Sequence, residues 1–224
     1  MKREIRITSD GSSTIHLPDW NENYHSTHGA IQEAKHVFLK HGFKPVLLPT
    51  ISILEIGFGT GLNCFLTLLE AEKNNIYIDY VGVEAYPVTE EEARQLNYVS
   101  ELKEEENQTV FEMLHSVSWE DSHLISKGFS LEKRQQFFKD IEDENCFDLV
   151  YFDAFGAEHQ PELWTVTIFR KMFKAMRIDG ILVTYSAKGS VRRAMQEVGF
   201  KVERLEGPPG KREMLRATKI DSSI

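Results

Sequence analysis

The sequence predicts an α/β protein with a mostly parallel sheet, and three observations lead to this prediction. Apolar runs rich in β-branched and aromatic residues recur along the chain, at 51–56, 76–84, 146–152 and 181–185. Segments with helical spacing of apolar residues lie between these runs, as in repeated strand–helix units. Three glycines at alternate positions, Gly57, Gly59 and Gly61, follow the first run directly. A glycine turn between strand and helix is where such a sheet brings its backbone close to a bound nucleotide.

Smaller elements are expected at both ends of the chain. Residues 4–17 alternate in polarity around Asp10 and Gly11, which predicts a β-hairpin, and a helix is expected over 30–39. Residues 201–205 and 212–218 flank a turn rich in glycine and proline and predict an antiparallel hairpin at the end of the sheet. We therefore expect a hairpin-and-helix extension at residues 1–45 and a main domain at 46–224.

The composition is that of an ordinary globular protein. Of the 224 residues, 41% are hydrophobic and 27% charged. The sequence has no apolar run that would span a membrane, and its first residues lack the apolar core of a signal peptide, so we expect a cytoplasmic protein. The two cysteines, Cys64 and Cys146, lie in apolar surroundings and indicate buried thiols without a disulfide framework.

Charge is unevenly distributed along the chain. The net charge is −9, yet the segment 188–219 holds nine basic residues and four acidic ones, a local net charge of +5. A basic segment on an acidic protein fits contact with one negatively charged macromolecule. Solvated charge on helix and hairpin surfaces is the alternative explanation. Four histidines (His25, His28, His36 and His41) lack a recognisable metal-ligand spacing, so we expect no metal site.

Acidic residues stand at the carboxyl ends of three predicted strands. They are Glu55, Glu84 and Asp153. Because ligands of an open parallel sheet bind beyond the carboxyl ends of its strands, we expect the three side chains to meet at one edge. Glu84 follows the second strand, where such folds place a carboxylate that accepts hydrogen bonds from a ribose diol.

The glycine spacing narrows the class of ligand. It departs from the G-x-G-x-x-G dinucleotide pattern, and no Lys-Ser/Thr pair follows it, which excludes a P-loop. The pattern E-x-G-x-G-x-G after a strand resembles that of Rossmann-like S-adenosylmethionine-dependent methyltransferases. This resemblance implies S-adenosyl-L-methionine as cofactor and S-adenosylhomocysteine as product, without flavin or metal, and it makes a dehydrogenase less favoured.

Several further blocks together resemble one bacterial family, the tRNA methyltransferases that complete 5-methylaminomethyl-2-thiouridine at the wobble position. The blocks occur in the order of the family across most of the chain, at 24–26, 29–30, 33, 37–39, 55–63, 83–87, 152–155, 160–164, 187–193, 199–200 and 211–215. The family includes a bifunctional form with a flavin-dependent oxidase, which has no counterpart here. The resemblance is therefore to the free-standing methyltransferase, with 46–224 as its methyltransferase domain.

The resemblance and the strand-end positions together imply roles for particular residues. Asp153 is expected to be catalytic, by orienting the substrate amine and accepting its proton. The residues expected to bind the cofactor are Glu55, Gly57, Phe58, Gly59, Gly61, Asn63 and Glu84. Those expected to bind the substrate are Phe155 and Tyr185 at the base, and Lys188, Arg192, Arg193, Lys211 and Arg212 at phosphates. The implied partner is the anticodon region of tRNA, with a functional link to the enzyme that makes the aminomethyl intermediate and no membrane association.

Two features depart from the family pattern. Gly156 and Ala157 replace the usual Ala-Pro after Phe155. The position at which the bifunctional relatives have a Gly-Asp near the adenine falls within residues 132–134, which lack that pair, so the adenine contact stays unassigned. Two other functions also fit the sequence. One is a methyltransferase acting on a small-molecule or protein amine, and the other is a noncatalytic nucleotide-binding scaffold.

Overall fold

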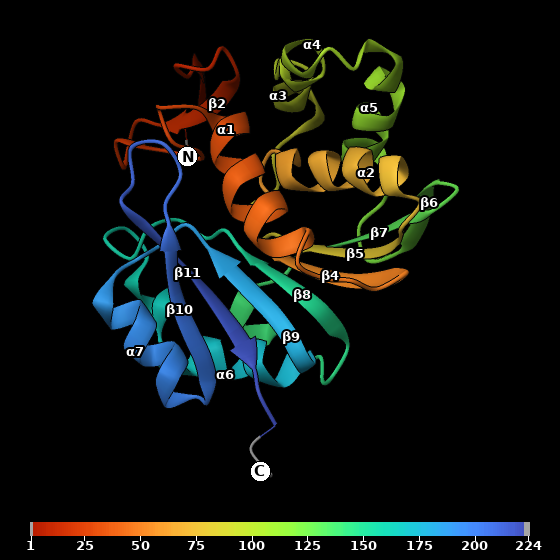
Figure 1. Cartoon of the computed structure of the whole chain (residues 1–224). Helices are drawn as coiled ribbons and strands as arrows, with labels where there is room; N and C mark the ends of the chain where they lie inside the picture. The colour runs from red at the N-terminus through yellow and green to blue at the C-terminus, as the bar shows by residue number, and fades with distance from the viewer. Residues whose placement is uncertain (1, 222–224) are drawn as a thin grey trace.

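A twisted eight-stranded sheet organises residues 2–221, the part of the chain that the computed structural model describes (Figure 1). The strand order is β10-β11-β9-β8-β4-β5-β7-β6. The parallel strands are β4 (Thr50–Ile56), β5 (Tyr77–Val83), β7 (Phe129–Arg134), β8 (Phe147–Phe152) and β9 (Met176–Thr184). The strands β6 (Ser122–Ser126), β10 (Phe200–Glu206) and β11 (Glu213–Lys219) pair antiparallel at the two edges. The predicted fold class, including the C-terminal antiparallel hairpin, is confirmed.

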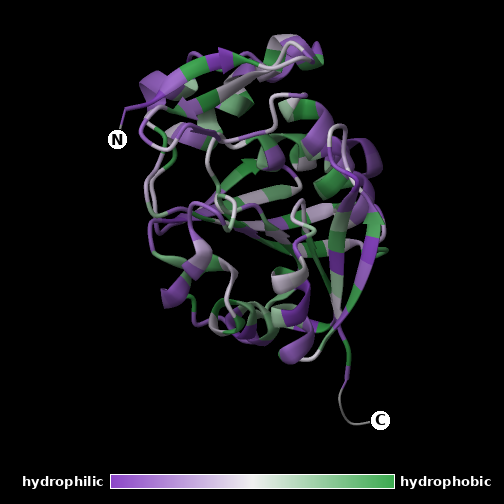
Figure 2. Ribbon diagram, turned by 90° about the vertical axis from the view of Figure 1, so that its left-hand side faces the viewer, coloured by the Kyte–Doolittle hydropathy of each residue, from purple (hydrophilic) through white to green (hydrophobic). Residues whose placement is uncertain are grey.

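Helices cover both faces of the sheet (Figure 1). One face carries α1 (Ala30–Ala34), its π-helical continuation η1 (Lys35–Phe43), α2 (Leu62–Asn74) and α5 (Gln108–Ser116). The other carries α6 (Val166–Ala175) and α7 (Gly189–Glu197). Successive side chains of a strand point to opposite faces. Accordingly Ile53 packs with the first group of helices and Leu54 with the second. Figure 2 shows the hydrophobic residues concentrated along these central strands and on the inward sides of the helices.

The N-terminal segment forms a small three-stranded antiparallel sheet, made of β1 (Glu4–Ile7), β2 (Ser13–Leu17) and β3 (Glu22–Asn23). The predicted hairpin is confirmed, and β3 was not foreseen. Ile15 and Leu17 are fully or almost fully buried and belong to the same hydrophobic cluster as Ile53 of β4. Burial of this apolar surface fixes the segment to the main sheet. The domain boundary at residues 45/46 stays a prediction.

Three short helical segments lie between β5 and α5. They are α3 (Glu90–Ala93), α4 (Tyr98–Leu102) and η2 (Glu105–Asn107). Thr89 caps α3 with a reciprocal capping box, in which Glu92 N–H donates to the Thr89 hydroxyl and Thr89 N–H donates to the Glu92 carboxylate. Another short element, η3 (Phe138–Asp140), follows β7.

The apolar spacing of the segment after β8 predicts one long helix from Pro161 to Arg177, but the structure divides this segment. A separate 3₁₀ turn, η4 (Pro161–Trp164), precedes α6, and the chain enters β9 at Met176. Met176 is completely buried and pairs with Phe147, so its packing in the sheet outweighs the helical spacing of the sequence. Serine is a common N-cap residue, and the sequence predicts Ser190 as the cap of the next helix. In the structure Ser190 lies inside α7, and Lys188 occupies the capping position.

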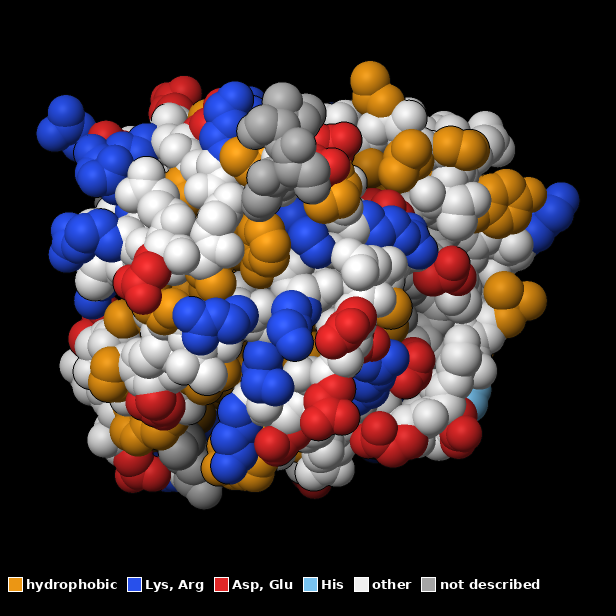
Figure 3. Space-filling view, turned by 90° about the horizontal axis from the view of Figure 1, so that it is seen from below, with side chains coloured by type: hydrophobic (Ala, Val, Ile, Leu, Met, Phe, Trp, Pro, Cys, Tyr) orange, Lys and Arg blue, Asp and Glu red, His pale blue; other side chains and the backbone are white. Residues whose placement is uncertain are grey.

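The surface carries both signs of charge. Figure 3 shows Lys and Arg side chains interspersed with Asp and Glu on the face seen from below. Among the described helices, none combines the length and apolar character required to cross a bilayer.

Candidate active site

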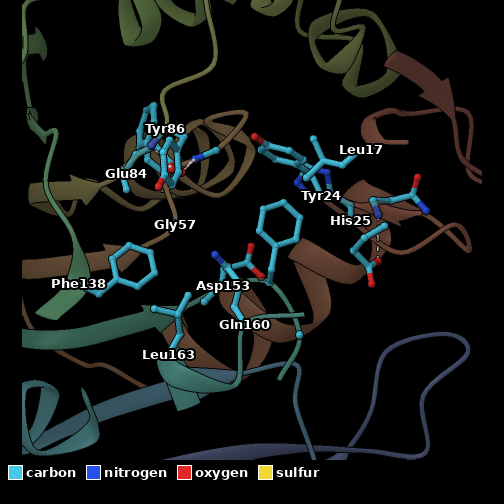
Figure 4. Close-up of a pocket in the computed structure, with 18 of the residues that line it drawn as sticks. Leu17, Tyr24, His25, Gly57, Glu84, Tyr86, Phe138, Asp153, Gln160 and Leu163 are labelled. Carbon is cyan, nitrogen blue, oxygen red and sulfur yellow. Dashed lines mark hydrogen bonds between the residues drawn. The ribbon is translucent and has the colours of Figure 1, made fainter. Parts of the chain in front are cut away.

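A pocket of about 1260 Å³ lies at the carboxyl ends of β4, β5 and β8 (Figure 4). Glu84, Gly57 and Asp153 line it from these strand ends, and Tyr24 and His25 line it from the loop after β3. Pockets for one drug-sized ligand measure roughly 300–1,000 Å³. The pocket therefore has room for a cofactor together with part of a second molecule.

The glycine turn forms the floor of this pocket. Gly57 has a φ of +90°, and a Cβ there would lie 2.8 Å from the Asp153 carbonyl oxygen. The N–H groups of Gly57 and Phe58 both donate to the Val83 carbonyl, at 3.0 and 3.1 Å. The ends of β4, β5 and β8 are thereby held together by backbone contacts that a side chain at position 57 would break.

Gly59 and Gly61 occupy different positions relative to the pocket. Gly59 lines it, and the Tyr24 ring packs against this glycine, with Cδ1 3.2 Å from the position of a Cβ. Tyr24 therefore forms a wall beside the turn, and the Gly59 backbone still faces the pocket. Gly61 has a φ of +70° and starts α2, below the lining residues.

Glu84 is fixed at the rim by backbone donors. The Gly59 N–H donates to its Oε2 at 3.1 Å, and the Tyr86 N–H donates to its Oε1 at 2.9 Å. Each carboxylate oxygen has two lone pairs, so both retain capacity for another donor. An oriented carboxylate with free acceptor capacity suits a vicinal diol.

A hydrogen-bonded chain links Glu55, Asn63 and Asp153. The Asn63 Nδ2 group donates to Glu55 Oε1 and to Asp153 Oδ2, each at 2.9 Å, and the Tyr80 hydroxyl donates to Glu55 Oε2 at 2.9 Å. Because both carboxylates can accept these bonds, they fix the orientation of the amide. Glu55 is completely buried and lies outside the pocket lining. It supports Asn63 from below, and the structure shows no direct path from Glu55 to a ligand in the pocket.

Asn63 lines the pocket and has one unused acceptor. The residue is only 4% exposed, and within the described residues its Oδ1 is buried without a hydrogen-bond partner. A buried acceptor without a partner is costly unless a ligand or water supplies a donor. An ammonium group of a bound ligand would satisfy it.

The two carboxyl groups linked through Asn63, those of Asp153 and Glu55, both have raised pKa values. Burial, reinforced by the negative charge of Glu33, raises the pKa of Asp153 to about 7, although the Asn63 hydrogen bond and Lys211 oppose the shift. Burial also raises the pKa of Glu55 well above its usual range. A pKa near 7 allows Asp153 to accept and release protons at neutral pH.

Aromatic side chains form another wall of the pocket. The Phe155 ring lies 5.0 Å from Tyr24 and 5.6 Å from Trp20, both edge to face. The Tyr185 hydroxyl donates to the Ala154 carbonyl at 2.8 Å, which fixes that ring beside Asp153. Phe155 and Tyr185 both line the pocket, where flat faces suit a nucleobase.

The structure divides the predicted phosphate-binding cations into two groups. Lys211 lines the pocket, where it pairs with Glu33. The other four, Lys188, Arg192, Arg193 and Arg212, lie outside the lining. Lys188 pairs with Glu158 at the rim, and Arg193 and Arg212 are exposed. Within residues 2–221, Arg192 Nε is buried without a partner.

Residues 132–134, where the family's Gly-Asp position falls and where the sequence left the adenine contact unassigned, belong to β7 and lie outside the pocket lining. Lys133 is buried and donates to the His115 carbonyl at 2.6 Å, and Arg134 pairs with Glu132 and Asp143. The residues that follow the strand line the pocket instead. They are Gln135, Phe137 and Phe138.

Sequence reasoning also missed Tyr24 and Glu33 as pocket residues. Both lie in blocks that resemble the methyltransferase family, so the signal was present, but no motif logic gave them a role. Within the described residues, no cluster of three or more His, Cys, Asp or Glu side chains forms a metal site.

The glycine turn, the strand-end carboxylates and the antiparallel β10–β11 edge are features of the Rossmann-like methyltransferase fold. Residues 133–220 match the model of a family described as S-adenosyl-L-methionine-dependent methyltransferase. The chain is also similar to the tRNA 5-methylaminomethyl-2-thiouridine biosynthesis bifunctional proteins MnmC. Identity to the Delftia acidovorans protein is 30%, covering 97% of this chain and 35% of that protein. Identity to the Cupriavidus metallidurans protein is 29%, and the match covers 93% of this chain and 32% of that protein.

Solved structures with a similar fold include a protein of the same name group. The crystal structure of MnmC2 from Aquifex aeolicus matches with a TM-score of 0.81 and 26% identity, covering 97% of this chain and 70% of that one. Spermidine synthase from Thermotoga maritima, at a TM-score of 0.54 and 16% identity, shares the fold alone. The chain is thus similar to the MnmC proteins over nearly its whole length, as its motifs predicted, and it spans about a third of the length of these bifunctional relatives.

Proposed function

We propose that this protein transfers a methyl group from S-adenosyl-L-methionine to the aminomethyl nitrogen of 5-aminomethyl-(2-thio)uridine at the tRNA wobble position. The product is 5-methylaminomethyl-(2-thio)uridine. One observation carries the proposal. Asp153, whose pKa is raised to about 7, is oriented by Asn63 and lies beside the glycine turn, in a pocket with room for a cofactor and part of a second molecule. The names of the MnmC relatives supply the substrate class.

The residues present fit the cofactor. Gly57 and Gly59 leave the backbone accessible, Glu84 offers acceptors for the ribose, and the unpaired Asn63 Oδ1 suits the ammonium of the methionine part. Phe138, which lies across the pocket from Tyr24 (Figure 4), would hold the adenine together with Gln135, another lining residue. When bound, the cofactor supplies a methyl group activated by a positively charged sulfur.

Asp153 acts as the general base that accepts a proton from the substrate ammonium group. A primary alkylamine is largely protonated at neutral pH and then has no lone pair to attack a methyl group. Asn63 holds Asp153 Oδ2, which leaves Oδ1 to take a proton from the substrate ammonium. The turn at Gly57 and Gly59 and the Glu84 carboxylate would hold the cofactor so that it supplies its methyl group to the freed nitrogen lone pair, while its sulfur keeps the electron pair of the broken S–CH₃ bond. The pocket places the two reactants for this displacement and excludes water from it.

The wobble base must leave the anticodon stack to reach the pocket. Phe155 and Tyr185 would receive the extruded uracil against their ring faces. Lys188, Arg192, Arg193 and Arg212 would contact phosphates outside the pocket. This arrangement fits a cytoplasmic enzyme that acts on tRNA already carrying an aminomethyl group, which another enzyme supplies.

The direct test follows the nucleoside product. Undermodified tRNA bearing 5-aminomethyl-2-thiouridine is incubated with the protein and S-adenosyl-L-methionine labelled in its methyl group, and its nucleosides are analysed by mass spectrometry. We expect the label in 5-methylaminomethyl-2-thiouridine. Label on free amines or protein instead would favour the alternative amine methyltransferase, and absence of transfer would favour a noncatalytic scaffold.

tRNA affinity should fall steeply with salt, because phosphate contacts release counterions. Arg193→Ala should weaken binding and reduce the slope of log affinity against log salt by about 0.7–0.9, the share of one phosphate contact. Gel retardation over a salt series measures both quantities. Lys73→Ala is the matched control, because Lys73 is an exposed cation on α2, which covers the opposite face of the sheet from α7. A salt-independent affinity would contradict the phosphate contacts.

A further inference from the structure

A charged and aromatic cluster lies inside the pocket, beside Asp153. Glu33 of α1 is only 8% exposed. The Ser26 N–H donates to its Oε2 at 2.9 Å, and the Lys211 ammonium donates to its Oε1. The same ammonium nitrogen lies 3.9 Å from the centre of the Tyr185 ring. One carboxylate and one aromatic face therefore hold a primary alkylammonium group within the pocket lining.

The two sides of this cluster differ in rigidity. Glu33 belongs to a buried helix and is held by the Ser26 backbone, and the Tyr185 ring is fixed by its bond to the Ala154 carbonyl at 2.8 Å. Lys211 reaches in from the loop between β10 and β11 on a flexible four-carbon stem, and its side chain is 34% exposed. The carboxylate and the ring thus retain their positions when the lysine moves out.

We infer that Glu33 and Tyr185 form the seat for the substrate alkylammonium group, and that Lys211 occupies this seat until the substrate displaces it. This inference rests on the proposed function, in which the substrate carries a primary aminomethyl group. The lysine side chain ends in the same chemical group, which carboxylates and aromatic faces both attract. Lys211 is then an internal competitor of the substrate and has no role as a phosphate contact.

The seat lies close enough to Asp153 for its charges to influence the proton transfer that follows substrate binding. Charges on Glu33 and Lys211 act on the Asp153 carboxyl group, the first raising its pKa and the second lowering it. An ammonium in the seat therefore lies within electrostatic reach of the proton acceptor. Exchange of one ammonium for another keeps the charge on the Glu33 carboxylate neutralised throughout.

The test compares three variants by steady-state kinetics with aminomethylated tRNA. Lys211→Met keeps the stem and removes the charge, so it should lower KM about tenfold with kcat within twofold of the wild type. Glu33→Gln should raise KM by about tenfold or more, and the double variant should resemble Glu33→Gln. Lys73→Met is the matched control, because it removes the same charge from a surface ion pair with Glu104, outside the pocket and the proposed phosphate contacts. Its KM should not fall.

Binding without methyl transfer separates this inference from the proposed function. Calorimetry at pH 7 with the nucleoside 5-aminomethyluridine should show tighter binding to Lys211→Met than to wild type, whereas uridine should bind both equally. Lys211→Gln provides a second variant if Lys211→Met folds poorly. Equal or weaker binding of the aminomethyl nucleoside by folded variants would overturn the inference, even if the wild type methylates tRNA. Tighter binding without methylation would support the seat and refute the proposed function.

Discussion

Replacement of Asp153 by asparagine is expected to lower the methyl-transfer rate by about 10²–10⁴-fold, the range for removal of a general base. The amide has nearly the shape of the carboxyl group, and its oxygen can still accept the hydrogen bond from Asn63 Nδ2, seen at 2.9 Å. It cannot take a proton from the substrate ammonium. Cofactor affinity, measured by calorimetry, should stay close to that of the wild type. Equal losses of turnover and cofactor affinity would contradict the assignment.

The pH dependence provides a second readout of the same substitution. Because the pKa of Asp153 is raised to about 7, the carboxyl group is protonated and unable to act as a base at lower pH. The wild-type kcat/KM should therefore rise through a limb near pH 7, and Asp153→Asn should lack this limb. Asp148→Asn is the control on the same strand. Asp148 accepts from the Ser52 N–H and from Arg177, so its loss should reduce stability and leave the pH profile unchanged.

The same variant should be more stable than the wild type at neutral pH. The unfolded carboxyl group ionises near its model value of 3.8, whereas the folded one holds its proton up to about pH 7. The contribution of this group to the wild-type free energy of unfolding is therefore greatest below about pH 4. This contribution is lost as the pH rises to about 7. The gain for Asp153→Asn should grow over this window to about 2 kcal/mol, after allowance for partial exposure. Thermal unfolding at several pH values measures it.

Most of the fold could be predicted because each strand is a short apolar run bounded by turn residues. The convergence of Glu84 and Asp153 was also predictable, since parallel strands present their carboxyl ends at one edge. Glu55 marks the limit of that argument. As a residue of β4 it obeys the alternation of the pleat, which points it under α2 toward Tyr80 and away from the ligand side. A residue inside the strand cannot face the edge as one beyond its end does.

The Glu33–Lys211 pair could not be predicted from local pattern. The two residues are 178 positions apart, and they meet only because the β10–β11 loop folds over the start of α1. Locally, Glu33 resembles a solvated helix residue, and Lys211 resembles a turn lysine within a basic segment. The helix that apolar spacing predicts as far as Arg177 ends earlier for a similar reason, because burial of Met176 in the sheet overrides local spacing.

Gly57→Ala is expected to cause the largest loss of stability and of cofactor binding together. Gly57 has a φ of +90°, which costs a residue with a Cβ roughly 1–3 kcal/mol. The added Cβ would also lie 2.8 Å from the carbonyl oxygen of Asp153, a backbone atom that cannot rotate away. We expect a total loss of about 2–4 kcal/mol, or roughly 5–15 °C in melting temperature for a chain of this size.

Relief of this clash must move the end of β8 away from the glycine turn, and Asp153 moves with it. Cofactor affinity should therefore fall by about tenfold or more, because a misplacement of even 1 Å weakens a preorganised site. Gly128→Ala is the matched control in the β6–β7 turn, where the nearest atom to a new Cβ is the Ile76 carbonyl oxygen at 3.6 Å. It should change stability by less than about 1 kcal/mol and leave cofactor binding intact. If Gly57→Ala matched this control in both measurements, contact between the turn and β8 would not be what positions Asp153.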